Sequence, residues 1–325
     1  MARRRGRKRW MVLGLLLLGL FMWINAPGLT ALAYRLYYTP RVAALPQAPA
    51  FSATDRVLLL SPHPDDETLC CAGMLQQAVA AGAAVYIAWL TSGDGFEWDA
   101  VLLRRTPDPG DAAMLELGRQ RMNEARAAAR VLGIPQAHLR FLGYPDQGLL
   151  RLFLDYYYYP FTAPHTGVDR VPYPEALSPG ASYTGESLER DLEKLFDEVQ
   201  PTVVLAPSPL DAHPDHRATG DLALRLLGKR KELGKARFWI VHGGLEWPLP
   251  KGLHKNLPLE PPPRGRGLPW GRVDLSPEQV ALKLEAAQAH RSQMLILGRF
   301  MEAFVRQNEL ISPLPLPEPS AHPVR

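Results

Sequence analysis

Short apolar runs alternate with longer amphipathic segments from residue 56 to residue 241, and this alternation restricts the fold more than any other feature of the sequence. The runs at 56–61 (RVLLLS) and 202–206 (TVVLA) are almost continuously apolar, as strands buried on both faces of a parallel sheet are. The segments between the runs have the apolar spacing and the Gly or Pro stop signals of helices. We therefore predict an α/β fold: a Rossmann-like, mostly parallel sheet with helices on both faces, reached by right-handed crossovers.

The individual elements can be assigned from the same patterns. The strands are predicted at 56–61, 85–90, 138–142, 202–206 and 238–241. The helices between them are predicted at 67–81, 112–132, 186–199 and 215–227. Residues 143–185 are too long for an ordinary connection, so we predict a lid or binding loop there. A pair of C-terminal helices is predicted within 277–308, beginning after Ser276 as the N-cap.

The N-terminus predicts an export or anchoring segment. Six of the seven residues at 3–9 are basic, and no charged residue occurs from Trp10 to Tyr34. A basic head of this kind stays in the cytoplasm by the positive-inside rule, so the rest of the chain would lie on the other side of the membrane. One alternative is a cleaved signal peptide, with residues 31–33 (ALA) at the cleavage site. The other is a helix buried in the core.

The excess positive charge is confined to this head. The chain has 37 basic and 33 acidic residues, and removing the six basic residues of the head leaves 31 basic against 33 acidic. The pI near 9.1 is therefore no evidence for a nucleic-acid-binding surface, and no nucleic-acid partner is expected.

These observations divide the chain into five parts. They are a basic head and transmembrane anchor at 1–34, a linker at 35–54, a catalytic domain at 55–245, a Pro-rich loop with C-terminal helices that pack on the domain at 246–311, and a disordered tail at 312–325.

Polar side chains that can bind a metal follow two of the predicted strands. Residues 61–67 read SPHPDDE, and residues 211–216 read DAHPDH. Both stretches lie at strand-to-helix turns, so we expect them at the same edge of the sheet, where ligands bind in such folds. One such turn alone would more often be a helix cap. Two together indicate a catalytic metal site made of His and carboxylate ligands with a position left open for water.

The two motifs resemble the signature of the PIG-L/LmbE-like zinc deacetylases, which include the N-acetylglucosaminyl-phosphatidylinositol de-N-acetylases. The similarity extends from about Val57 to His242. It also includes residues 91–94 (TSGD), Arg121-x-x-Glu124 and residues 142–146 (LGYPD).

The resemblance implies a catalytic metal centre. In it, His63, Asp66 and His216 ligate zinc, and Asp65 is the general base that takes the proton of the attacking water. Sites built from His and carboxylate groups accept several divalent metals, so Fe²⁺ or another divalent ion is an alternative to zinc.

The resemblance also implies roles for the residues around the metal. His213 is the electrophile or acid at the carbonyl oxygen, and Asp215 orients it. Arg121 and Asp146 occupy positions that face the polar substrate. The adjacent Cys70 and Cys71 fall in a helix and are interpreted as small packing residues.

Together these features predict a membrane-anchored, extracytoplasmic zinc enzyme that hydrolyses the acetamide of an N-acetylated amino sugar. Its partners would be that sugar and, through the N-terminal segment, the membrane. One alternative is a non-catalytic carbohydrate-binding module on the same fold. The other is an amidase that acts on a thiol conjugate or a peptide amide.

Overall fold

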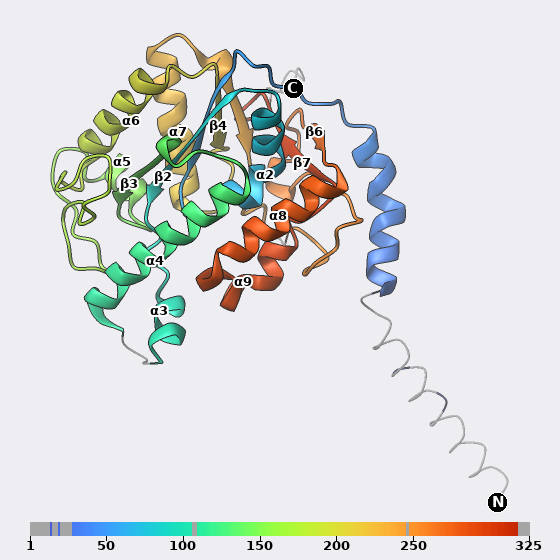
Figure 1. The fold of residues 1–325 in the computed structure, drawn as a ribbon, viewed down its shortest axis with the longest axis horizontal. Helices are drawn as coiled ribbons and strands as arrows, with labels where there is room; N and C mark the ends of the chain where they lie inside the picture. Colours follow the sequence, from blue (N-terminus) through green and yellow to red (C-terminus); the bar gives the residue numbers. More distant parts are fainter. Residues whose placement is uncertain (1–13, 15–18, 20–27, 106–108, 245–246, 318–325) are drawn as a thin grey trace, which may run out of the picture.

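The computed structural model describes residues 14, 19, 28–105, 109–244 and 247–317. Its centre is a five-stranded sheet with the strand order β3-β2-β1-β4-β5, in which all neighbours are parallel (Figure 1). The strands are β1 (Arg56–Ser61), β2 (Ala84–Thr91), β3 (Leu139–Tyr144), β4 (Val203–Pro207) and β5 (Ala236–Trp239). The predicted α/β class and parallel sheet are confirmed.

The sheet forms because the residues of its central strands are apolar on both faces, so both faces can be buried in the core. The four residues 57–60 of β1 are completely buried, and β1 pairs with β2 on one side and β4 on the other. Every predicted strand is present with each end within two residues of its predicted position.

Helices cover the sheet and connect its strands. From β1 onwards the α-helices are α2 (Asp66–Ala80), α3 (Glu97–Arg104), α4 (Gly110–Val131), α5 (Leu149–Leu154), α6 (Gly185–Val199), α7 (Pro214–Lys229), α8 (Pro277–Ala289) and α9 (Arg291–Glu302). The four helices predicted between the strands correspond to α2, α4, α6 and α7. The sequence does not predict the short helices α3 and α5, because about two turns or fewer do not establish a helical period.

The C-terminal part packs on the sheet domain, as Figure 1 shows for α8 and α9 beside α2 and α4. Ser276 caps α8 in a reciprocal capping box with Gln279. A two-stranded antiparallel sheet of β6 (Gly271–Asp274) and β7 (Asn308–Ile311) adds to the predicted elements. The predicted disordered tail is wrong at its start: Ser312 exchanges two backbone hydrogen bonds, of 2.7 and 2.8 Å, with Phe238 of β5. Residues 318–325 lie outside the described residues.

The N-terminal segment is described only in part. Residues 28–43 are helical, so the predicted linker at 35–54 is wrong over its first nine residues. The helix contacts the body through Tyr34, whose hydroxyl donates to the carbonyl oxygen of Pro258 over 3.0 Å. Most of the predicted anchor lies outside the described residues. Among the helices that the structure does describe, none is both long enough and apolar enough to span a membrane.

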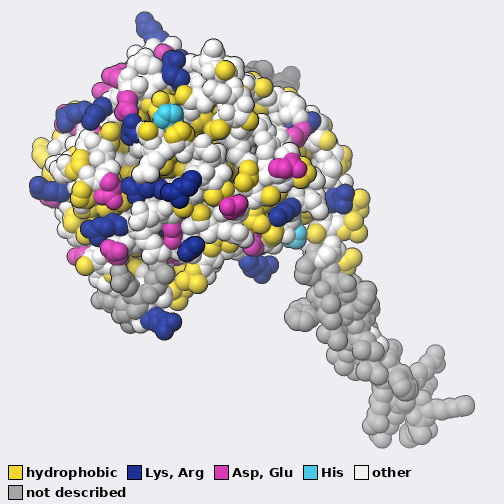
Figure 2. Space-filling view, viewed as in Figure 1, with side chains coloured by type: hydrophobic (Ala, Val, Ile, Leu, Met, Phe, Trp, Pro, Cys, Tyr) yellow, Lys and Arg dark blue, Asp and Glu magenta, His cyan; other side chains and the backbone are white. Residues whose placement is uncertain are grey.

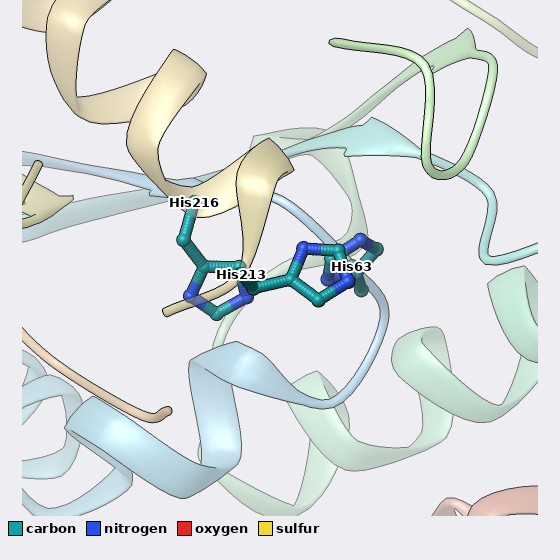
Figure 3. A group of neighbouring side chains, drawn as sticks. All are labelled: His63, His213 and His216. Atoms are coloured by element: carbon teal, nitrogen blue, oxygen red, sulfur yellow. The ribbon is translucent and has the colours of Figure 1, made fainter. Parts of the chain in front are cut away.

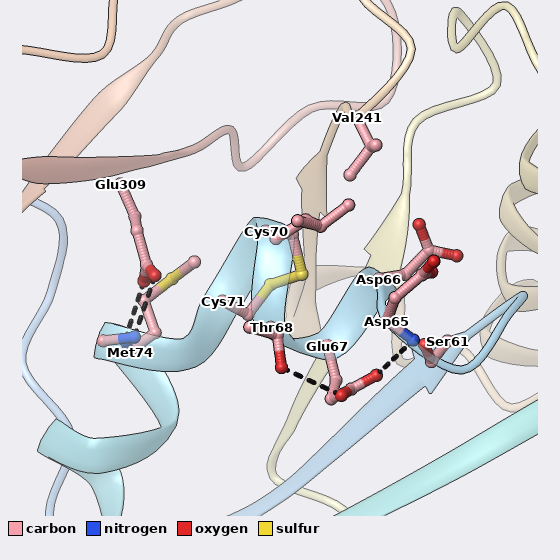
Figure 4. The surroundings of a disulfide bond; sticks show 12 residues. Ser61, Asp65, Asp66, Glu67, Thr68, Cys70, Cys71, Met74, Val241 and Glu309 are labelled. Carbon is pink, nitrogen blue, oxygen red and sulfur yellow. Dashed lines mark hydrogen bonds between the residues drawn. A yellow bond between two sulfur atoms is a disulfide. The ribbon is translucent and has the colours of Figure 1, made fainter. Parts of the chain in front are cut away.

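Cys70 and Cys71 form a disulfide between adjacent residues of α2 (Figure 4). Both are buried in the core, as expected of small packing residues, but the structure also bonds them to each other, which their interpretation from the sequence does not include. Shortly after them in α2, the backbone N–H groups of Gly73 and Met74 each donate to the carboxylate of Glu309 over 2.8 Å.

The same carboxylate belongs to a buried ion pair. Lys283 of α8 donates to Glu309 over 2.7 Å and to the carbonyl oxygen of Leu69 over 2.9 Å. This ion pair of the C-terminal part thus completes the hydrogen bonding of α2.

Charged side chains on the surface are arranged differently. On the face drawn in Figure 2, basic side chains are scattered among acidic and apolar ones. The pair of Arg190 with Glu186 is typical, because both side chains are more than half exposed. Exposed pairs of this kind contribute roughly 0–1 kcal/mol to stability.

We expect Lys283→Met to lower the free energy of unfolding by about 3–5 kcal/mol, because it leaves Glu309 as an unpaired buried charge. Arg190→Met, which also removes a basic side chain but from an exposed pair, should cost less than about 1 kcal/mol. Urea unfolding of both variants measures the difference. Equal losses would show that the buried pair does not support α2.

Candidate active site

The two polar motifs meet at the centre of the sheet. β1 and β4 are neighbours, and the chain leaves their carboxyl ends into α2 and α7. The strand order reverses between β1 and β4, and ligands bind at such switch points. Figure 3 shows the result: His63 comes from the turn after β1, while His213 and His216 come from the turn and first residues of α7.

His63, Asp66 and His216 form a tight group, in which the two imidazole rings lie on either side of one carboxylate oxygen. Oδ2 of Asp66 lies 3.2 Å from Nδ1 of His63 and 3.1 Å from Nε2 of His216. All three residues are buried, and neither ring nitrogen of His216 makes a well-directed hydrogen bond to another described residue. A buried imidazole of this kind beside a carboxylate fits a metal ligand.

Further donors lie within reach of the same place. Three overlapping groups of side chains could each hold an ion: His63 with His213 and His216, Asp66 with His216 and His242, and His63 with Asp146 and Asp215. The cluster therefore suits a divalent metal, and it offers more donors than the three predicted ligands.

Asp211 contacts the ring of His216 on the side away from Asp66, a role that the sequence did not suggest. Its Oδ2 accepts the backbone N–H of Val241 and of His242 and lies 3.2 Å from Nδ1 of His216. Burial alone would raise the pKa of Asp211, but the His216 ring beside it holds the pKa well below its usual range. Burial alone would likewise lower the pKa of His216, whereas Asp211 and Asp66 raise it to about 10. The one signal in the sequence is the position of Asp211 at the start of the second motif.

Asp65 lies beside the cluster in an unusual backbone conformation, with φ of 142°. Its carboxylate is 3.2 Å from the guanidinium of Arg121, which also donates to the carbonyl oxygens of Gly93 and Pro64, each over 2.9 Å. Burial raises the pKa of Asp65 to about 7, against the opposing charge of Arg121. A carboxylate with such a pKa can take up a proton near neutral pH.

Asp215 contacts two histidines of the cluster. Its backbone N–H donates to Nδ1 of His213 over 3.2 Å, so the contact that orients His213 comes from the backbone of Asp215. Its carboxylate faces His63 instead: Oδ2 lies 3.2 Å from Nε2 of His63 and accepts the backbone N–H of Gln147 over 2.7 Å.

Asp146 and Arg121 both line the pocket. Asp146 contacts Nε2 of His63 at 3.1 Å, the same nitrogen that Asp215 approaches. Arg121 contacts Asp65, as described above. The role of both residues towards the substrate stays a prediction.

His213 is fixed by the backbone. As N-cap of α7, its Nδ1 accepts the backbone N–H of Asp215 over 3.2 Å. Burial, and then the neighbouring imidazoles of His63 and His216, lower the pKa of His213 to about 2. A neutral imidazole whose Nδ1 accepts must carry its proton on Nε2, so His213 is a hydrogen-bond donor.

These groups line a cavity of about 150 Å³. Its floor is polar, and much of its wall is apolar: Leu69, Phe96, Val241, Leu297, Phe300 and Met301. The last three belong to α9, so the C-terminal part, predicted only to pack on the domain, also forms the pocket. Local patterns cannot reveal this contact, because α9 lies more than 80 residues beyond the ends of β1 and β4.

Comparison with known proteins places the chain in a family. Residues 58–227 match the model of PIG-L, the GlcNAc-PI de-N-acetylase family. A probable N-acetyl-α-D-glucosaminyl L-malate deacetylase 2 of Bacillus anthracis is 28% identical, over 73% of this chain and 80% of its own. A 1D-myo-inositol 2-acetamido-2-deoxy-α-D-glucopyranoside deacetylase of Corynebacterium glutamicum is 27% identical, over 74% and 76%.

Solved structures agree on the fold. The A40926 pseudoaglycone deacetylase Dbv21 is 21% identical with a TM-score of 0.51, covering 80% of this chain and 96% of its own. The chain belongs to the PIG-L family. This membership confirms the predicted resemblance and the predicted class of enzyme, a metal-dependent N-deacetylase.

We expect Asp211→Asn to weaken the binding of a divalent metal about 10–100-fold, because a neutral amide no longer holds His216 as a ligand. Titration of the metal-free protein with Zn²⁺ measures the effect. Asp155→Asn, a change of the same type at an exposed carboxylate, should leave the affinity unaltered. Equal affinities of the two variants for Zn²⁺ would show that Asp211 does not contribute to the metal centre.

Proposed function

We propose that the protein hydrolyses the acetamide of an N-acetylated amino sugar and releases acetate, with zinc as its metal. The observation that carries this proposal is the arrangement of Asp65 and His213 beside a cluster of metal ligands. One is a carboxylate able to take up a proton, and the other is a neutral N–H donor. Both relatives described above are named as deacetylases of glucosamine conjugates, which supports the sugar.

The proposed ligands are His63, Asp66 and His216. A divalent metal there would polarise the amide oxygen and lower the pKa of the attacking water. Asp65 takes the proton of that water, and Arg121 keeps the Asp65 carboxylate directed into the pocket. His213 donates its Nε2 hydrogen to the carbonyl oxygen as negative charge develops there. The leaving amine then receives the proton that Asp65 accepted, so the products are acetate and the free amino sugar.

The alternatives are less well supported. A non-catalytic carbohydrate-binding module would not need a proton acceptor and a proton donor beside a ligand cluster. An amidase for thiol conjugates or peptides would share this chemistry, so the substrate decides between them.

We further propose that the N-terminal segment anchors the protein in the membrane with the catalytic domain outside the cytoplasm. The basic head followed by the uncharged stretch from Trp10 to Tyr34 supports this orientation. The disulfide of Cys70 and Cys71 supports it independently, because disulfides persist in oxidising compartments. The substrate would then be a glycan or glycolipid of the cell envelope.

The purified domain should release acetate from one or more members of a panel of N-acetylated sugars and envelope glycans, and a chelator should stop the release. Asp65→Asn should keep the metal and lose about 10²–10⁴ in rate, because the amide cannot take up the proton. His63→Ala, as a contrast, should lose metal and activity together.

Metal content and free acetate are measured on the same samples. If the Asp65→Asn protein bound no metal, Asp65 would be assigned as the metal ligand and Asp66 as the base. Release of an amine other than an amino sugar would favour the amidase alternative.

Protease added to intact cells that express the full chain should cleave the domain beyond Tyr34, because the proposed orientation exposes it. Lysed cells provide the control for cleavage. A domain that is protected until lysis would contradict the orientation and, with it, the preference for an envelope substrate.

A further inference from the structure

Glu67 is completely buried next to the proposed base and is held by four donors, of which Figure 4 shows two, the hydroxyl of Thr68 and the backbone N–H of Asp65. Its Oε2 accepts the backbone N–H of Asp65 over 3.0 Å and the indole N–H of Trp89 over 2.9 Å. Its Oε1 accepts the hydroxyl of Thr68 over 2.9 Å and lies 2.7 Å from Nε2 of His290. Because an ionised carboxylate only accepts, His290 is the donor in the last of these bonds.

His290 reaches this place from a distant part of the chain. It is the residue between α8 and α9, it is completely buried, and it lies 63 residues beyond the end of the matched family region at residue 227. The same break makes a second buried contact: Ser292 donates its hydroxyl to Glu124 of α4 over 2.7 Å. The C-terminal helices therefore attach to the domain directly behind the catalytic turn.

The backbone of Asp65 needs such support. A residue other than Gly at a φ of 142° costs on the order of 1–3 kcal/mol and persists only where its surroundings hold it. The bond from its N–H to Glu67 holds it on one side. Glu67 can supply this bond only while its own carboxylate is kept in place, with Trp89 fixing one oxygen and His290 the other.

We infer that His290 is a positioning residue for Asp65, acting through the carboxylate of Glu67. The inference rests on the proposed function, in which Asp65 takes the proton of the attacking water. Within the described part of the chain, the side chain of His290 bonds to Glu67 and Thr68 and does not line the cavity. Its loss displaces the base without removing it, and displacements of about 1 Å cost up to roughly 10²-fold in rate.

The test compares three variants of the full-length protein. His290→Leu removes the donor, and His290→Gln restores an N–H donor near the position of Nε2. Ser292→Ala removes a buried hydroxyl donor next to the same break, while Glu124 keeps its bonds from the backbone N–H of Ser292 and from Gln120. Glu124 makes no hydrogen bond to Asp65 in the described structure, so this variant leaves the support of Asp65 intact. Each variant is measured for kcat and KM on the substrate found in the panel, for metal content, and for stability.

We expect His290→Leu to lower kcat about 10–100-fold with KM and metal content unchanged, and His290→Gln to recover to within about threefold of the wild type. Ser292→Ala should lose stability and keep kcat. The inference is overturned if His290→Leu behaves like Ser292→Ala, or if His290→Gln is as slow as His290→Leu.

A second measurement does not depend on turnover. Amide hydrogen exchange of a peptide spanning Asp65 should accelerate in His290→Leu and remain unchanged in Ser292→Ala. If the wild type hydrolyses no sugar of the panel, the proposed function fails and the exchange result alone decides the positioning role. Should His290→Leu not fold, Trp89→Phe removes the other distant side-chain donor of Glu67 and should change kcat and exchange in the same direction; no change in either would overturn the inference.

Discussion

The pairing of β1 with β4 is the constraint on which the site depends. Val57 lies opposite Val203 and Leu59 opposite Leu205, so the two strands end at the same level of the sheet. The turns that follow carry histidines and aspartates from positions about 150 residues apart. No local interaction could bring these side chains together. The register of two apolar strands does so, and a shift of the register would separate them.

A cluster of ionisable groups in the core loses the hydration that its members would have in water, and hydrogen bonds and opposite charges offset this loss. Asp211, Asp146 and Asp215 each accept backbone N–H groups while they contact a histidine of the cluster. Buried charges are tolerated when they are paired and hydrogen-bonded in this way. The same contacts fix the orientation of the rings, so the arrangement that stabilises the cluster also prepares it for chemistry.

Local patterns in the sequence are enough to predict the sheet, the main helices and the meeting of the two polar turns at one edge of the sheet. Apolar runs such as 202–206 are unambiguous, and the polar residues that follow them must lie at the carboxyl edge of a parallel sheet. What could not be predicted depends on contacts between distant segments. The partner of Asp215, the support of His216 by Asp211, and the wall formed by α9 follow from tertiary packing that no single window contains. The edge contact of Ser312 escapes prediction for the same reason, since a Pro-rich tail predicts no partner.

The position of α9 late in the chain has a consequence for the order in which the protein is completed. The ribosome has synthesised all the side chains that could bind a metal by residue 242, but the wall formed by Leu297, Phe300 and Met301 begins 55 residues later. The residues that enclose the pocket are thus the last part of the site to be made. Chains that end before α9 would leave the apolar residues on the opposite side of the cavity exposed to water. Such exposed apolar surface makes these chains targets for chaperones and proteases rather than partly active enzymes.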